Sequence, residues 1–162
     1  AASDVYKRQI ERVICMSLTA LQLAEYTIRR AAEKETPITN LKLQKTLYYI
    51  QGYSLRVFDS PAFDETISHW QYGPVVPIVY FTYSTNGAAP LCVNDATDVP
   101  ALSKEQCDLY NKVIDKCLFL SARALVEKTH QETPWKETSD REIISHEEIQ
   151  KFFCHSNPLE LS

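Results

Sequence analysis

Glycine is the scarcest structural residue in this chain, because its 162 residues include only Gly52, Gly73 and Gly87. The phosphate-binding loops GxGxxG and GxxxxGK need several glycines close together, and this sequence cannot form them. Few turns that require a positive φ can be built either, which disfavours glycine-rich β architectures. The scarcity of glycine therefore argues against nucleotide-binding folds.

Long hydrophobic runs and an excess of positive charge are also missing. Hydrophobic residues make up 44% of the chain and charged residues 23%, and no apolar run approaches the roughly 18 residues of a membrane span. The net charge is -4, whereas nucleic-acid-binding domains carry basic surfaces. We therefore predict one globular domain that does not enter a membrane, and the composition disfavours nucleic-acid binding.

The five cysteines form no CxxC pair and are odd in number. No secretory signal precedes them, so this usage is typical of reduced thiols in a cytoplasmic protein. We expect most of them to be small side chains of the core. The sequence thus predicts a cytoplasmic protein without disulfides.

Catalytic and metal-binding patterns are weak. The four histidines are dispersed, with neither an HExxH motif nor an i, i+4 pair suited to zinc, and there is no GxSxG motif. A nucleophile could be built from Cys117 near His130, but Cys117 falls on the apolar face of its helix, where a core thiol is the simpler interpretation. The sequence predicts no catalytic residue, no bound metal and no cofactor.

The N-terminal segment differs from the rest of the chain. Residues 4–9, DVYKRQ, resemble the translation of a transposon-type sequencing adapter, and Met16 stands directly before a helix-start signal. We therefore expect residues 1–15 to be a non-native extension and residues 16–162 to form the domain. A genuine N-terminal helix is the alternative, because residues 10–14 include apolar side chains at helical spacing.

Helix starts are clearly marked. A capping box, in which a Ser or Thr hydroxyl and the Gln or Glu three residues later satisfy two free backbone N–H groups, is predicted at three places. The three pairs are Thr19–Gln22, Ser103–Gln106 and Ser145–Glu148. The first helix should end near Lys34, before Pro37. Ser121 is expected to begin a further short helix that ends near Thr129.

The segment 39–58 is predicted to be the most buried helix, because apolar residues occupy two of its faces. One face has Leu43, Leu47, Ile50 and Val57, and the other has Leu41, Tyr48, Leu55 and Phe58. Gly52 lowers helix stability by about 1 kcal/mol relative to alanine, and close approach of a neighbouring helix would explain it.

β structure is predicted to be minor. Residues 66–72, TISHWQY, read as one short strand, and residues 91–93 are its expected partner. Residues 75–83 have helical spacing with Pro77 admissible in a first turn. The predicted fold class is therefore mainly α, a single compact multi-helix domain with a short two-stranded β element.

Two runs, residues 69–77 and 129–136, concentrate aromatic, histidine and proline side chains without helical periodicity. Large amphipathic side chains beside rigid turns can anchor a partner, although they can equally cover the core. Residues 127–148 are net acidic, which a solvated face would explain. The candidate partner-binding residues are Trp70, Tyr72, Pro74, His130 and Trp135.

Three separated motifs resemble a known family. They are ITNLKLQK at 38–45, YGPVVP at 72–77 and THQETPWK at 129–136. In this order and spacing they are similar to the Panacea domain family, which is also described as SocA-like antitoxins and phage-associated GepA-like proteins. The resemblance covers nearly everything from Leu18 to Phe153.

The resemblance implies a small cytoplasmic antitoxin of a bacterial or prophage toxin–antitoxin pair. Such proteins neutralise a cognate toxin by binding it directly, and one branch also hands its toxin to a protease as an adaptor. No enzymatic activity follows from the resemblance. Two other classes stay open at this point: a small helical hydrolase that uses His130 with Glu132, and a DNA-binding regulator, which the composition supports little.

Overall fold

The mainly α fold class is confirmed by a computed structural model, which describes residues 18–162. The prediction that residues 1–15 are a non-native extension lies outside the described residues. The longer helices and the short ones between them are α2 (Ala20–Glu33), α3 (Asn40–Phe58), α4 (Pro77–Thr82), η1 (Ser84–Asn86), α5 (Lys104–Phe119), α6 (Ala122–His130), α7 (Thr133–Lys136) and α8 (His146–His155). The strands are β1 (Ile67–Trp70), β2 (Gly73–Val75) and β3 (Ile143–Ile144).

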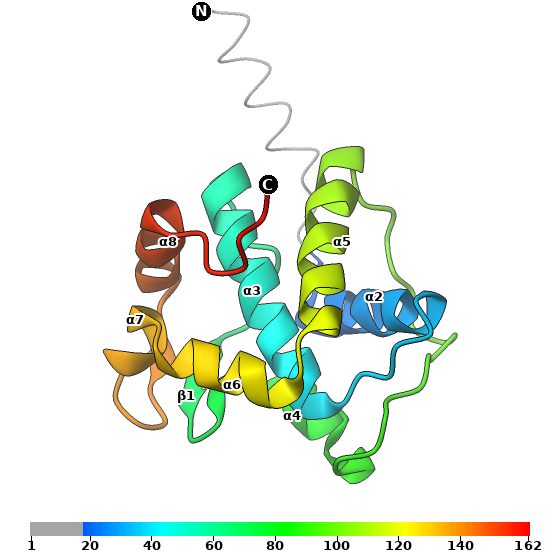
Figure 1. Cartoon of the computed structure of the whole chain (residues 1–162). Coiled ribbons are helices and arrows are strands. Elements are labelled where there is room, and N and C mark those ends of the chain that lie inside the picture. Colours follow the sequence, from blue (N-terminus) through cyan, green and yellow to red (C-terminus); the bar gives the residue numbers. More distant parts are fainter. Residues whose placement is uncertain (1–17) are drawn as a thin grey trace, which may run out of the picture.

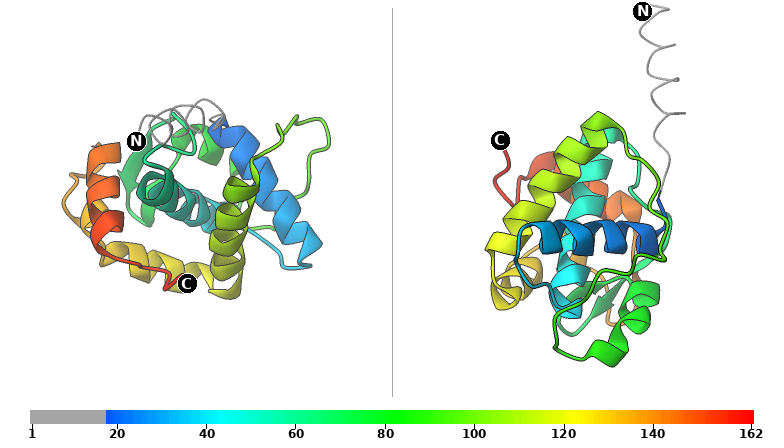
Figure 2. Two further views of the ribbon diagram at one scale, coloured as in Figure 1. Left: turned by 90° about the horizontal axis from the view of Figure 1, so that it is seen from above. Right: turned by 90° about the vertical axis from the view of Figure 1, so that its right-hand side faces the viewer.

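Helix α3 lies at the centre of the domain, as its two apolar faces predict. It packs against α5 and α2 on one side and against α8 and α6 on the other, and it also contacts β2 (Figures 1 and 2). Every residue from Lys42 to Leu55 is buried. Two of the predicted apolar positions, Leu41 and Val57, are instead exposed, because they lie near the ends of the helix, beyond the neighbours that cover its middle.

The close approach predicted at Gly52 is confirmed. A Cβ at this position would lie 2.3 Å from the ring of Phe153 in α8. The same ring makes edge-to-face contacts with Tyr48, Tyr49 and Tyr53, at centroid distances of 5.7, 6.2 and 5.2 Å. Gly52 thus lets α8 press an aromatic ring against the central helix.

The predicted helix starts are confirmed. The capping boxes at Thr19 and Ser103 have both of their hydrogen bonds. At Ser145 the hydroxyl accepts from the backbone N–H of Glu148 at 3.2 Å, but the reciprocal hydrogen bond from the Glu148 side chain is absent among the described residues, so the capping box predicted there is only half formed. Ser121 begins α6 in the same way, accepting from the N–H of Ala124 at 3.0 Å.

The β element differs from the prediction in size and in pairing. It has three antiparallel strands in the order β2-β1-β3. The strand partner expected at residues 91–93 is wrong: Leu91 is buried in a loop, where its N–H donates to the carbonyl oxygen of Ile38 at 2.8 Å. The predicted helix 75–83 begins only at Pro77, because Val75 pairs with Ser68 in the sheet.

The prediction that most cysteines are core side chains is also wrong for the described residues. Cys117 is buried, whereas Cys107 is partly exposed and both Cys92 and Cys154 are exposed. All four are free thiols. Between residues 18 and 162, no helix is both long enough and apolar enough to cross a bilayer.

Candidate partner-binding site

The hairpin of β1 and β2 fits tightly against α3 and α6. Its two strands meet at the pair Trp70–Gly73, and Gly73 has a φ of +105°, a conformation that side chains rarely adopt. A Cβ on Gly73 would also lie 2.7 Å from Oγ1 of Thr129 and 2.8 Å from Cε of Lys45. The hairpin therefore requires glycine at this position.

Two consecutive side chains of α3 hold this hairpin by its backbone. Nζ of the fully buried Lys45 donates a hydrogen bond of 2.9 Å to the carbonyl oxygen of Pro74. Oε1 of Gln44 accepts from the N–H of Val76 at 2.9 Å. Burial disfavours the ammonium ion and lowers the pKa of Lys45 to about 7. The first of the three family-like motifs thus contributes internal anchors to the hairpin.

A second buried charged residue, Glu132, links α3 to the segment between α6 and α7. The hydroxyl of Tyr49 donates to its Oε1 at 2.7 Å and that of Tyr48 donates to its Oε2 at 2.9 Å. Burial raises the pKa of Glu132 to about 7, although the two tyrosine hydrogen bonds oppose that rise. The carboxyl group therefore fixes the start of α7 against the central helix.

Three aromatic rings form a stack beside the hairpin. The ring of Trp135 lies between His69 and His130, at centroid distances of 4.2 and 4.1 Å. Nε1 of Trp135 donates to the carbonyl oxygen of Trp70 at 2.9 Å. Burial lowers the pKa of His130, and the charges of Lys45 and His69 lower it further. This stack connects β1 to the ends of α6 and α7.

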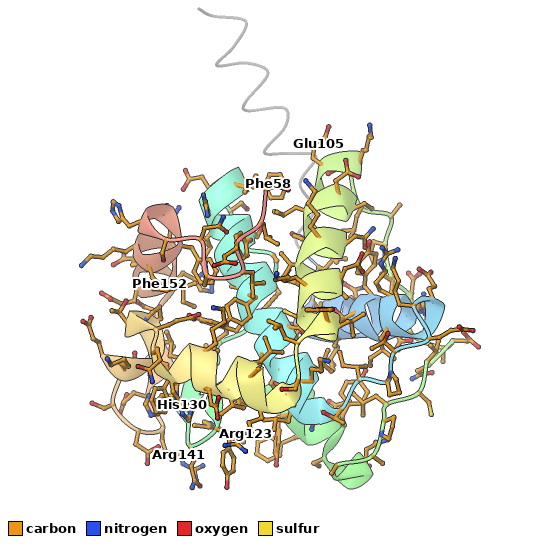
Figure 3. The ribbon with its side chains drawn as sticks, in the orientation of Figure 1. Phe58, Glu105, Arg123, His130, Arg141 and Phe152 are labelled. Atoms are coloured by element: carbon orange, nitrogen blue, oxygen red, sulfur yellow. The ribbon has the colours of Figure 1, made fainter. Side chains whose placement is uncertain are left out.

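The five predicted partner-binding residues thus lie in one region but differ in exposure. Trp70, His130 and Trp135 are half-buried and are linked by the contacts of the stack, and Figure 3 shows His130 at the lower end of the molecule. Pro74 is buried, with its carbonyl oxygen occupied by Lys45. Tyr72, in the turn of the hairpin, is 59% exposed. Of the five, Tyr72 has the largest free surface for a partner.

The geometry does not favour the hydrolase that would use His130 with Glu132. Both carboxylate oxygens of Glu132 are engaged by tyrosines, and within residues 18–162 no hydrogen bond joins the two side chains. Burial raises the pKa of the Cys117 thiol to about 12, so that it stays protonated at neutral pH. Neither arrangement supplies an activated nucleophile.

The residues that position this region are only partly identifiable from the sequence. Lys45 and Gln44 lie within a family-like motif, but a lysine in a helix is ordinarily taken as exposed. In the sequence, Glu132 is a candidate catalytic group beside His130, whereas the structure shows that it accepts hydrogen bonds from Tyr48 and Tyr49 of α3. The exposed side chains of Ile78 and Phe81 were missed, although their i, i+3 spacing in a short helix could have identified them.

These features define a class of protein, a small helical domain in which hydrogen bonds from side chains of a central helix hold a β-hairpin. The chain belongs to the family described as antitoxin SocA-like, Panacea domain, which matches residues 43–136, more than half of its length. The matched residues run from α3 to α7 and therefore include the hairpin, its anchors and the aromatic stack.

One curated relative is the antitoxin SocA of Caulobacter vibrioides (strain NA1000 / CB15N). It is 38% identical to this chain over 71 residues, which are 44% of this chain and 38% of the relative. The chain therefore aligns with well under half of the relative's length. No solved structure matches the chain.

Proposed function

We propose that this chain is the antitoxin of a bacterial or prophage toxin–antitoxin pair and that it neutralises its toxin in the cytoplasm by direct, stoichiometric binding. Membership of the SocA-like family supports an antitoxin role. Direct binding is supported by the β1–β2 hairpin, which Lys45 and Gln44 hold against α3. This hairpin lies inside the matched segment and has the exposed Tyr72 in its turn.

The anchors of the hairpin suit it to protein binding. Tyr72 and Trp70 contribute contact area, whereas Pro74, His130 and Trp135 hold that surface in place from beneath and beside it. A surface that is ordered before binding loses less conformational entropy when a complex forms. Rigid aromatic side chains also carry much of the binding energy of many interfaces.

The proposal is tested by expressing the neighbouring gene of the source genome with and without this chain. Its product, expressed alone, should arrest growth, and expression of this chain should restore it. The two purified proteins should form a complex of fixed stoichiometry, and a dissociation constant in the nanomolar range would correspond to about -12 kcal/mol. Loss of the toxin from cells only when a protease is present would add delivery to that protease as a second step.

Substitutions locate the surface. Tyr72→Ala should weaken the complex by about 1 kcal/mol or more while circular dichroism stays unchanged. Phe119→Ala is the matched control, because Phe119 is an exposed aromatic residue on α5. Catalysis, and not binding, would explain rescue by trace amounts of this chain together with a covalent change in the toxin.

A further inference from the structure

Residues 66–94 contain no Asp, Glu, Lys or Arg, although 23% of the whole chain is charged. The stretch includes β1, β2, α4 and η1. Much of it lies at the surface, since Tyr72, Ile78 and Phe81 are 59%, 50% and 63% exposed. Soluble proteins usually intersperse exposed apolar side chains with charges, so a charge-free surface of this kind indicates contact with another molecule.

Exposed and half-buried aromatic side chains of β1 and α4 contact one another at this surface. The ring of Trp70 lies 4.9 Å from that of Tyr80 and 5.8 Å from that of Phe81, and the last two rings are 5.5 Å apart. Ile78 lies one helical turn before Phe81 and shares its side of α4. We call these three rings, together with the exposed Ile78 and with the exposed Tyr72 in the adjoining turn of the hairpin, the aromatic face.

The cation Arg141 borders the aromatic face. The guanidinium carbon of Arg141 lies 5.4 Å from the ring centroid of Trp70. Arg141 has a φ of +67°, which is uncommon for a residue with a side chain, and its N–H donates to the carbonyl oxygen of His69 at 2.9 Å. Figure 3 shows Arg141 at the lower edge of the molecule.

The charge of Arg141 is not neutralised within the described part of the chain. Its neighbours Asp140 and Glu142 are acidic, yet no carboxylate of residues 18–162 forms an ion pair with it. The backbone conformation and the ring of Trp70 instead hold the guanidinium beside an uncharged surface. Such a group can accept a carboxylate from another molecule, with charge-assisted hydrogen bonds.

We propose that the aromatic face binds an apolar segment of the toxin and that a carboxylate on this segment pairs with Arg141. This inference rests on the proposed function, because it names the chemistry of the partner at the same region. A charged partner surface would lose its hydration against residues 66–94 without compensation, which favours apolar side chains. A basic segment would be repelled by Arg141, whereas an acidic one is attracted.

A second copy of the chain fits this surface less well. In a twofold dimer each patch meets its own copy. The aromatic face itself has no carboxylate, so only Asp140 or Glu142 of the second copy could pair with Arg141. Self-association is therefore a competing outcome, measured by sedimentation of the full chain and of its Phe81→Ser variant. A wild-type dimer that becomes a monomer in the variant would overturn the proposal.

The test uses a random peptide library displayed on phage and selected against the full chain. Enriched peptides should combine several large apolar residues with at least one Asp or Glu. A synthetic enriched peptide should bind about tenfold more weakly to Phe81→Ser, and about equally well to the Phe119→Ser control. Enrichment of basic peptides, or of none, would overturn the proposal.

A double-mutant cycle assigns the carboxylate. Replacing the peptide's acidic residue by its amide should weaken binding to the wild-type chain about tenfold, and it should have little effect on binding to Arg141→Gln. Equal losses in both proteins would contradict the pairing with Arg141.

The neighbouring toxin distinguishes failure of the binding surface from failure of the antitoxin role. If wild-type chain fails to rescue growth, the proposed function fails. If Phe81→Ser and Arg141→Gln both rescue as fully as wild type, this further inference fails and the proposed function stands.

Discussion

The two halves of the domain around α3 are held together in different ways. On the side of α2 and α5 the core is largely aliphatic, with fully buried side chains such as Leu23 and Ile114, although Lys42 of α3 also donates to the carbonyl oxygen of Leu118 there. Towards the hairpin, α6 and α7, the core buries Lys45 and Glu132, which are fixed by hydrogen bonds. The first half therefore depends mainly on burial of apolar area, whereas the second depends more on hydrogen bonds made by two buried ionisable groups, Lys45 and Glu132. We therefore expect the halves to respond differently to substitution and to pH.

The largest effect should come from the aliphatic half. Leu47→Ala removes a side chain that is fully buried, and it should lower the free energy of unfolding by about 2–5 kcal/mol, since the cavity adds to the lost transfer energy. Chemical denaturation monitored by circular dichroism measures the change. A loss below about 1 kcal/mol would contradict the central position of this residue.

A smaller loss is expected at the hairpin. Gly73→Ala should destabilise the domain by about 1–3 kcal/mol, because the new methyl group meets Lys45 and Thr129 at a positive φ. Gly87→Ala is the matched control: Gly87 also has a positive φ, but nothing lies within 4 Å of the position that its Cβ would take. If both substitutions have the same effect, contact with α3 and α6 does not decide the position of the hairpin.

The pH dependence of stability sharpens the comparison further. Glu132 has its pKa raised from 4.5 to about 7 in the folded state, so the folded chain binds more protons between these values and its stability falls as the pH rises from 4.5 to 7. Lys45 has its pKa lowered from 10.5 to about 7, so the unfolded chain binds more protons and stability rises from pH 7 to 10.5.

Neutral variants separate the two slopes. Glu132→Gln should remove the fall below pH 7, and Lys45→Met should remove the rise above it, in urea titrations at a series of pH values. The Leu47→Ala variant is the control, because it should shift the whole curve without changing its shape. An unchanged slope in either neutral variant would contradict the assignment of that group.

The smallest effect is expected for Trp135→Phe. This change keeps a ring between His69 and His130 but removes the hydrogen bond to the carbonyl oxygen of Trp70. A single hydrogen bond of this kind contributes about 0.5–1.5 kcal/mol. Since Trp70 is then the only tryptophan, its fluorescence reports whether the strand has moved. Unchanged stability together with unchanged fluorescence would show that this bond does not hold β1.

Prediction from sequence succeeded where neighbouring residues decide the structure. The caps at Thr19, Ser103 and Ser121 lie within three residues of the groups that they bind. The prediction failed for the sheet, because β3 pairs with β1 across more than 70 residues and has only two residues of its own. The sequence motifs named five candidate residues that the structure places in one region, but they did not show which of these residues are buried, and the role of the five in binding stays a prediction.

The sequence by itself determined the helical class, the helix starts, the close approach at Gly52 and the family resemblance. These depend on local hydrogen bonds, on the period of apolar residues and on motif spacing, which are all written along the chain. Only the tertiary structure decided that Lys45 and Glu132 are internal anchors and that Tyr72, Phe81 and Arg141 remain available at the surface. The physical reason is that burial and charge pairing depend on which distant segments meet, and residue type alone does not specify those contacts.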